Sequence, residues 1–124
     1  RMQDLTTAAL QPGRTGDEVL AAARAAAAAA GIDGDVYSHP VGVHGHGAGP
    51  AIGMWDQQDG VPGAGSAPVH PDTVYALELC VRVPVAEWGG QLVRMALEQG
   101  IALTTAGVEY LDQRQTELIL IPSA

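Results

Sequence analysis

The chain has 124 residues, of which 47% are apolar, and this is enough for the core of one ordinary domain. Its formal net charge is −8 and it contains no lysine, so it lacks the basic face that nucleic acids and anionic membranes require. No apolar run approaches the roughly 18 residues of a membrane span, and the single cysteine excludes an internal disulfide. We therefore expect neither nucleic acid nor a membrane as a partner.

Two helices are predicted at the start of the chain. Residues 2–10 have the composition of the last part of a helix, which Pro12 and Gly13 would stop. Residues 16–30 form the second predicted helix, because Thr15 and Glu18 have the spacing of a capping box and a glycine follows the alanine run. The chain begins inside a predicted helix, so we expect its N-terminal part to be missing and leave its localisation undetermined.

The rest of the chain alternates in the manner of β-strands. The segment 73–85, "TVYALELCVRVPV", places successive residues on opposite faces, and "GGQLVRMALEQ" repeats this alternation after a predicted hairpin turn. Residues 45–72 are rich in Gly, Pro, Asp and Gln and predict a long loop of the kind that is often functional. Further extended segments are predicted at "DVYSHPVGV", "IALTTAG" and "TELILIP". Helices followed by antiparallel strands predict an α+β fold.

Two glutamates lie at matching places on the predicted strands. Glu78 interrupts an otherwise apolar strand, and Glu98 falls on the corresponding face of the next one. A buried carboxylate is costly unless it is paired or bound to a metal. Two interpretations remain open at this point: a metal site built on converging carboxylates, or ion pairs with Arg82 and Arg94 across a solvated sheet face.

Three of the four histidines lie within the glycine-rich segment "YSHPVGVHGHGAGP". His44 and His46 are either exposed loop residues or ligands, whereas His39 has the position of a structural hydrogen-bonding residue. The glycine pattern does not fit a dinucleotide fingerprint or a P-loop, because it opens no predicted helix and no lysine is present to reach a phosphate. Cys80, on the apolar strand, is predicted to be a small buried side chain.

The order of these features resembles the pita-bread metallopeptidases, which include methionine aminopeptidase, Xaa-Pro aminopeptidase, prolidase and creatinase. In "HGHGAG", "VYALEL" and "VRMALEQG", the residues His46, Glu78 and Glu98 look like three metal ligands of that family. The segments "YSHP", "IGMWDQQDGVPG" and "QTELILIP" look like bacterial Xaa-Pro aminopeptidase-like proteins. The resemblance implies that residues 1–124 are the C-terminal portion of a catalytic domain, with an antiparallel sheet, helices on one face and about half of the pita-bread fold.

The resemblance also implies a chemistry. A pair of divalent ions (Mn, Co, Fe or Zn) would activate a water and polarise the carbonyl of an N-terminal peptide bond. The family's substrate-binding histidine corresponds to Gly42 here, so His44 or His39 would have to take that catalytic role. If His46, Glu78 and Glu98 hold one ion, they should converge within about 5 Å, with ligand distances of roughly 2.0–2.2 Å.

Departures from the family pattern limit what this chain can do alone. Two metal-binding aspartates that precede the "PG" turn in the family have no counterpart here, because only "RMQDLTTAAL" lies upstream. We therefore expect the chain to be inactive by itself and to hold no metal pair. The alternative is a non-catalytic relative that binds peptides or proteins. Besides a peptide, we expect self-association, because one helix layer is too small to cover the apolar strands.

Overall fold

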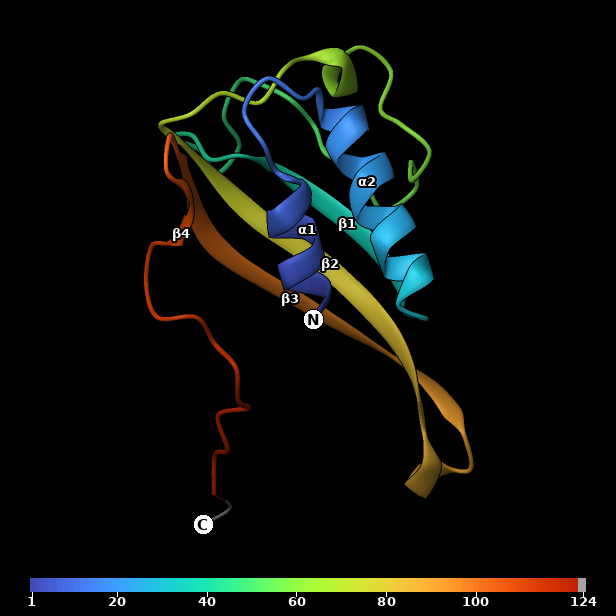
Figure 1. Cartoon of the computed structure of the whole chain (residues 1–124). Helices are drawn as coiled ribbons and strands as arrows, with labels where there is room; N and C mark the ends of the chain where they lie inside the picture. The colour runs from blue at the N-terminus through green and yellow to red at the C-terminus, as the bar shows by residue number, and fades with distance from the viewer. Residues whose placement is uncertain (123–124) are drawn as a thin grey trace.

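The structure is a computed structural model that describes residues 1–122, and it is α+β as predicted. Two helices precede a four-stranded antiparallel sheet with the strand order β1-β2-β3-β4, and both helices lie on one face of this sheet (Figure 1). The elements are α1 (Met2–Ala9), α2 (Gly16–Ala29), β1 (Asp33–Pro40), β2 (Thr73–Val85), β3 (Gln91–Thr104) and β4 (Gly107–Tyr110), with short 3₁₀ turns at Ala64–Ser66 and Ala86–Trp88. No helix within residues 1–122 has the length and apolarity to cross a membrane.

The helix α2 begins where the sequence predicts it. The Thr15 side chain accepts a hydrogen bond from the Glu18 amide at 3.2 Å, and the Glu18 carboxylate accepts one from the Thr15 amide at 2.8 Å. This reciprocal arrangement satisfies two amide groups that the helix itself leaves unpaired. Farther along, Ala23 and Ala27 are fully or almost fully buried, and their small side chains let α2 lie close to the sheet.

The core lies between the helices and one face of β1, β2 and β3. Alternate residues of the sheet point into it, and each is at most 1% exposed: Val36, Tyr75, Leu77, Leu79, Ile101 and Leu103. The intervening residues point to the opposite face, which neither helix covers (Figure 1). We call this second face the open face; it carries the candidate site.

Two strand predictions were wrong, although β2 spans the predicted residues. The segments "GGQLVRMALEQ" and "IALTTAG" form one continuous strand, β3, because the glycine between them stays extended opposite Ala76. The short strand β4 follows this strand and was not predicted. The segment "TELILIP" forms no strand in the described part of the chain, and four of its apolar side chains are 74–91% exposed: Leu118, Ile119, Leu120 and Ile121.

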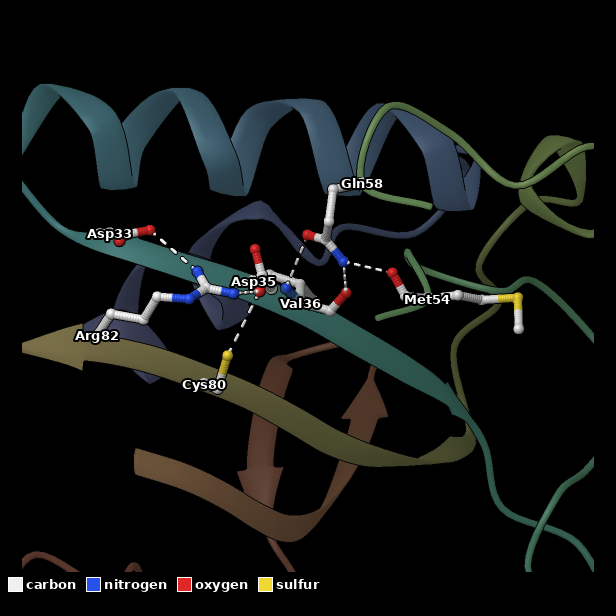
Figure 2. Close-up of polar contacts among 7 residues, drawn as sticks. All are labelled: Asp33, Asp35, Val36, Met54, Gln58, Cys80 and Arg82. Atoms are coloured by element: carbon white, nitrogen blue, oxygen red, sulfur yellow. Dashed lines mark hydrogen bonds and ion pairs between the residues drawn. The ribbon is translucent and has the colours of Figure 1, made fainter. Parts of the chain in front are cut away.

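The long loop between β1 and β2 is fixed to the edge of the sheet by Gln58 (Figure 2). Its amide nitrogen donates to the carbonyl oxygens of Val36 and Met54, at 2.7 Å each, and its amide oxygen accepts from the Val36 amide at 3.0 Å. Gly53 has a φ of +71° beside this contact, and a Cβ there would collide with the Val36 carbonyl oxygen. The loop therefore lies tightly along β1.

Candidate functional site

The two glutamates are directly opposite each other on the open face. The strands β2 and β3 are antiparallel neighbours, and their register pairs Glu78 with Glu98. Directly opposed residues of an antiparallel pair project from the same face, so the predicted shared face of the two carboxylates is confirmed. The Glu78 side chain is 17% exposed, whereas Glu98 is an exposed residue.

His39 reaches Glu78 from the neighbouring strand β1. Its Nε2 lies 2.9 Å from the Glu78 Oε1, and its Nδ1 lies 2.9 Å from the Pro40 carbonyl oxygen. The His39 side chain is 9% exposed, so both ring nitrogens have a partner where water has little access. The Pro40 carbonyl oxygen can only accept, so Nδ1 carries the proton of that hydrogen bond. The hydrogen bond between Nε2 and Glu78 is an ion pair when its proton lies on Nε2, and a neutral pair when the proton lies on the carboxyl oxygen.

His46, which belongs to the glycine-rich loop, contacts His39 and its neighbour on the same face of β1. Its ring stacks on that of His39, with the centroids 3.9 Å apart and the planes tilted by 16°. Its Nε2 lies 3.0 Å from the hydroxyl of Tyr37, a β1 residue that the sheet register pairs with Glu78. Trp55 contacts Tyr37 as well: its ring is edge-on to the Tyr37 ring, with the centroids 5.6 Å apart. We call Tyr37, His39, His46, Trp55 and Glu78 the imidazole cluster.

His44 does not join this cluster through a side-chain contact. It is exposed, and its backbone forms an isolated antiparallel bridge with His46 across the turn. The turn therefore directs His46 toward β1 and leaves the His44 ring on the surface of the loop.

The arginines of the open face are engaged elsewhere. Arg82 makes ion pairs with Asp33, at 3.0 Å, and with Asp35 (Figure 2). Burial favours a raised pKa for the Asp35 carboxyl, but the hydrogen bond and charge of Arg82 outweigh it, and the pKa lies below its usual value. Arg94 lies over the Trp55 ring, 4.6 Å from its centroid. Within residues 1–122, neither glutamate pairs with an arginine, so the ion-pair interpretation of the open face is not realised.

The three proposed metal ligands do not form a ready metal site. Imidazole and carboxylate are the donor types that Mn, Co, Fe or Zn would accept. Yet no group of three or more His, Cys, Asp or Glu side chains in the described residues is placed to hold an ion. The Nε2 of His46 faces the Tyr37 hydroxyl, and one oxygen of Glu78 faces His39. The expected convergence of His46, Glu78 and Glu98 on one ion is therefore not met by this chain alone.

Sequence reasoning missed two members of the imidazole cluster. Tyr37 is two residues before His39 and therefore shares its face of β1, so the alternation of the strand could have revealed it. Trp55 has no such signal, because it lies in an irregular loop that is held to β1 by Gln58 and by the bridge between Ser38 and Ile52.

Comparisons with known proteins place the fold. No family model and no curated protein matches the sequence. Among solved structures, the crystal structure of X-Pro aminopeptidase from Thermotoga maritima MSB8 matches with a TM-score of 0.64 and 19% identity. The match covers 97% of this chain and 30% of that one. The chain has about half of a pita-bread fold. At this identity the likeness concerns the fold, and the chain spans less than a third of the similar protein.

Proposed function

We propose that this chain is the C-terminal portion of the catalytic domain of an aminopeptidase-like protein, which hydrolyses the N-terminal peptide bond of its substrate with a pair of divalent ions. The observation that carries the proposal is the register that sets Glu78 opposite Glu98, with His46 above the same face. This is the order and placement of residues that the resemblance to pita-bread metallopeptidases implies. The structural similarity to an X-Pro aminopeptidase supports it at the level of fold.

In this proposal the chain supplies part of the site. Glu78, Glu98 and His46 are the metal-binding residues, and donors from outside this chain complete the set. When bound, the ions would supply a nucleophilic water and polarise the scissile carbonyl. His39 fixes the orientation of the Glu78 carboxylate, and exposed His44 is free to contact a peptide at the rim of the cluster. The chain alone is inactive because its three donors are not assembled around an ion.

The test compares this chain with the full-length protein that its gene encodes. Both are assayed on Xaa-Pro peptides and on peptides without proline, with Mn, Co or Zn. We expect activity only in the full-length protein, and we expect Glu78→Ala and Glu98→Ala to abolish it. Glu87→Ala is the matched control, since Glu87 is an exposed glutamate on the turn between β2 and β3. Full activity after loss of either Glu78 or Glu98 would refute the assignment.

A second candidate function is a metal-independent peptide-binding module. It is favoured by the contacts that already occupy the proposed ligands, because His46 faces Tyr37 and Glu78 faces His39. Titration calorimetry with the same peptides in the presence of a chelator separates the two candidates. Peptide binding that survives the chelator, in a full-length protein that cleaves nothing, would support the binding module and refute the enzyme.

A further inference from the structure

The outer edge of β3 is not paired with another strand along most of its length, although residues 114–118 line a pocket together with Met95 and Leu97. This strand pairs with β2 from Gln91 to Leu103, but β4 pairs only with Ile101–Thr104. Next to that pairing, the Leu111 amide donates to the Gly100 carbonyl oxygen at 3.1 Å. Within the part of the chain that the structure describes, no strand pairs with the outer edge of residues 91–99, and the β2–β3 hairpin extends beyond both helices (Figure 1). An open edge of this length is a template for another strand.

The contact of Leu111 determines which backbone groups this edge presents. In an antiparallel strand, alternate residues direct both their N–H and C=O groups to the same side. Since the Gly100 carbonyl points outward, toward Leu111, the even-numbered residues before it present their backbone groups to the open edge. These residues are Leu92, Arg94, Ala96 and Glu98. A strand added here must pair through these even-numbered residues, and we call a register that does so one of matching parity.

The side chains along this edge are complementary to those of a second copy of the same edge. Arg94 and Glu98 project from the open face, four residues apart, with small Ala96 midway between them. Met95 and Leu97 project from the helix-bearing face and remain 41% and 40% exposed, although they are large apolar residues. In the described residues neither Glu98 nor Arg94 makes an ion pair, and the Arg94 guanidinium lies over the Trp55 ring, 4.6 Å from its centroid. This chain assembles no metal site in the described residues, so Glu98 can pair with a partner's arginine, whereas Arg94 must leave the Trp55 ring to pair with a partner's glutamate.

We propose that a second copy of this chain pairs with this edge, β3 antiparallel to β3, about a twofold axis at Ala96. This register sets Arg94 opposite the partner's Glu98 and, by symmetry, Glu98 opposite the partner's Arg94. It also sets Met95 opposite the partner's Leu97 on the helix-bearing face, where both are exposed. Opposite charges and apolar side chains that face each other across antiparallel strands stabilise the pairing.

The other registers of matching parity lack this complementarity. Moving the axis to Met95 or Leu97 sets both charges opposite uncharged residues. Moving it to Arg94 or Glu98 sets a charge opposite its own copy, which is destabilising. In the proposed register the two sheets become one continuous sheet. A twofold axis perpendicular to this sheet places both open faces, with their imidazole clusters, on the same side of the dimer.

Sedimentation velocity of the 124-residue chain over a concentration series tests the proposal. We expect a monomer–dimer equilibrium whose dissociation constant rises at least about tenfold in Arg94→Glu, because two like-charge contacts replace two attractive ones. The double variant Arg94→Glu with Glu98→Arg restores the attraction with reversed signs and should recover the dimer. Asp59→Arg is the control charge reversal, on an exposed residue beside α2. A chain that stays monomeric up to its solubility limit would overturn the proposal.

Oxidative cross-linking tests the register itself. Ala96→Cys should form a disulfide-linked dimer, because hydrogen-bonded residues opposite each other have Cα atoms about 5.5 Å apart, within disulfide reach. Arg94→Cys should not cross-link, because its copy lies four residues away along the strand. The wild type, whose only cysteine is buried Cys80, sets the background. A dimer that Arg94→Cys links and Ala96→Cys does not, or that persists unchanged in Arg94→Glu, would refute the axis at Ala96.

Discussion

At the residue scale, the contact between His39 and Glu78 gives the open face its first testable consequence. Both side chains have little exposure, and each is the other's partner at 2.9 Å. Glu78→Ala leaves the His39 Nε2 buried without a partner, so we expect it to lower the free energy of unfolding by about 1–3 kcal/mol. Urea unfolding monitored by circular dichroism measures this difference.

The opposing glutamate provides the matched control. Glu98 is exposed and makes no ion pair in the described residues, so at concentrations at which the chain is monomeric Glu98→Ala should stay within about 0.5 kcal/mol of the parent chain. Equal effects of the two substitutions would mean that the His39 contact contributes nothing to stability. The double variant His39→Gln with Glu78→Ala then tests coupling, because its effect should be smaller than the sum of the two single effects.

The pair of Asp35 and Arg82 predicts a pH dependence. The folded state holds the pKa of the Asp35 carboxyl below its usual value of 3.8. A lowered pKa contributes stability that is fully present above the usual value and is lost as the pH falls through the folded-state pKa. We expect Asp35→Asn to lower the stability at pH 7 by about 1 kcal/mol, reduced from a buried pair by the partial exposure of Arg82.

Thermal unfolding at pH 7 and at pH 2 measures this contribution. The difference between the parent chain and Asp35→Asn should shrink at the lower pH, because below pH 3.8 the unfolded chain takes up a proton at Asp35 more readily than the folded chain does. Asp56→Asn, at an exposed loop aspartate without an ion pair in the described residues, is the control. A difference that does not change with pH would show that the charge of Asp35 is not what stabilises the fold.

The sequence predicts one of these arrangements, the shared face of the two glutamates, but not the contacts of the histidines. The shared face of Glu78 and Glu98 follows from alternation on two strands joined by a tight turn, and the register confirms it. The contact of His39 with Glu78 could not be predicted, because it joins residues 39 apart and depends on the pairing of β1 with β2. The stacking of His46 on His39 depends on a glycine-rich turn whose backbone has no regular period.

At the scale of elements, the attachment of the long loop to β1 makes a prediction about local stability. Gln58 replaces a strand partner for the Val36 amide and carbonyl, and it also holds Met54. Gln58→Ala should increase amide hydrogen exchange at Val36, whose amide loses its acceptor, and through residues 53–60, whose attachment to β1 is weakened. The neighbouring Gln57→Ala is the control, since the Gln57 side chain reaches only the Met54 sulfur, at 3.6 Å. Equal exchange in the two variants would show that the loop is held by other contacts.

Element boundaries show where local signals suffice. The helix α2 and the strand β2 lie where capping and alternation predict them, because both signals are local. The sequence analysis did not predict that β3 continues through Gly100. A glycine weakens a strand, but here Gly100 pairs with Ala76 of β2, and this pairing keeps it in the sheet. The apolar run near residue 119 has strand composition but no neighbour in the described residues, and composition alone does not pair a strand.

At the scale of the whole molecule, two observations bear on whether this chain holds a metal ion by itself. The chain matches 30% of an X-Pro aminopeptidase structure, and its proposed ligands are not assembled around an ion. An ion that binds only the folded protein stabilises it by about 2.7 kcal/mol at a hundred times its dissociation constant. This chain presents His46, Glu78 and Glu98 without assembling them, so we expect Mn or Zn to leave its melting temperature unchanged. If the chain is part of a larger aminopeptidase-like protein, as we propose, that protein should melt at a higher temperature when either ion is added, because it supplies further donors.

Differential scanning fluorimetry of both proteins, with and without a chelator, provides the measurement. In the full-length protein the stabilisation should disappear in Glu98→Ala and persist in Glu87→Ala, because only the first residue lies opposite Glu78 on the open face. If the 124-residue chain is itself stabilised, and Glu98→Ala removes that effect, then three donors are sufficient and His46 must leave the Tyr37 hydroxyl to bind the ion. If neither protein responds to any of these ions, the metal assignment is refuted, and peptide binding in the presence of a chelator becomes the hypothesis to test.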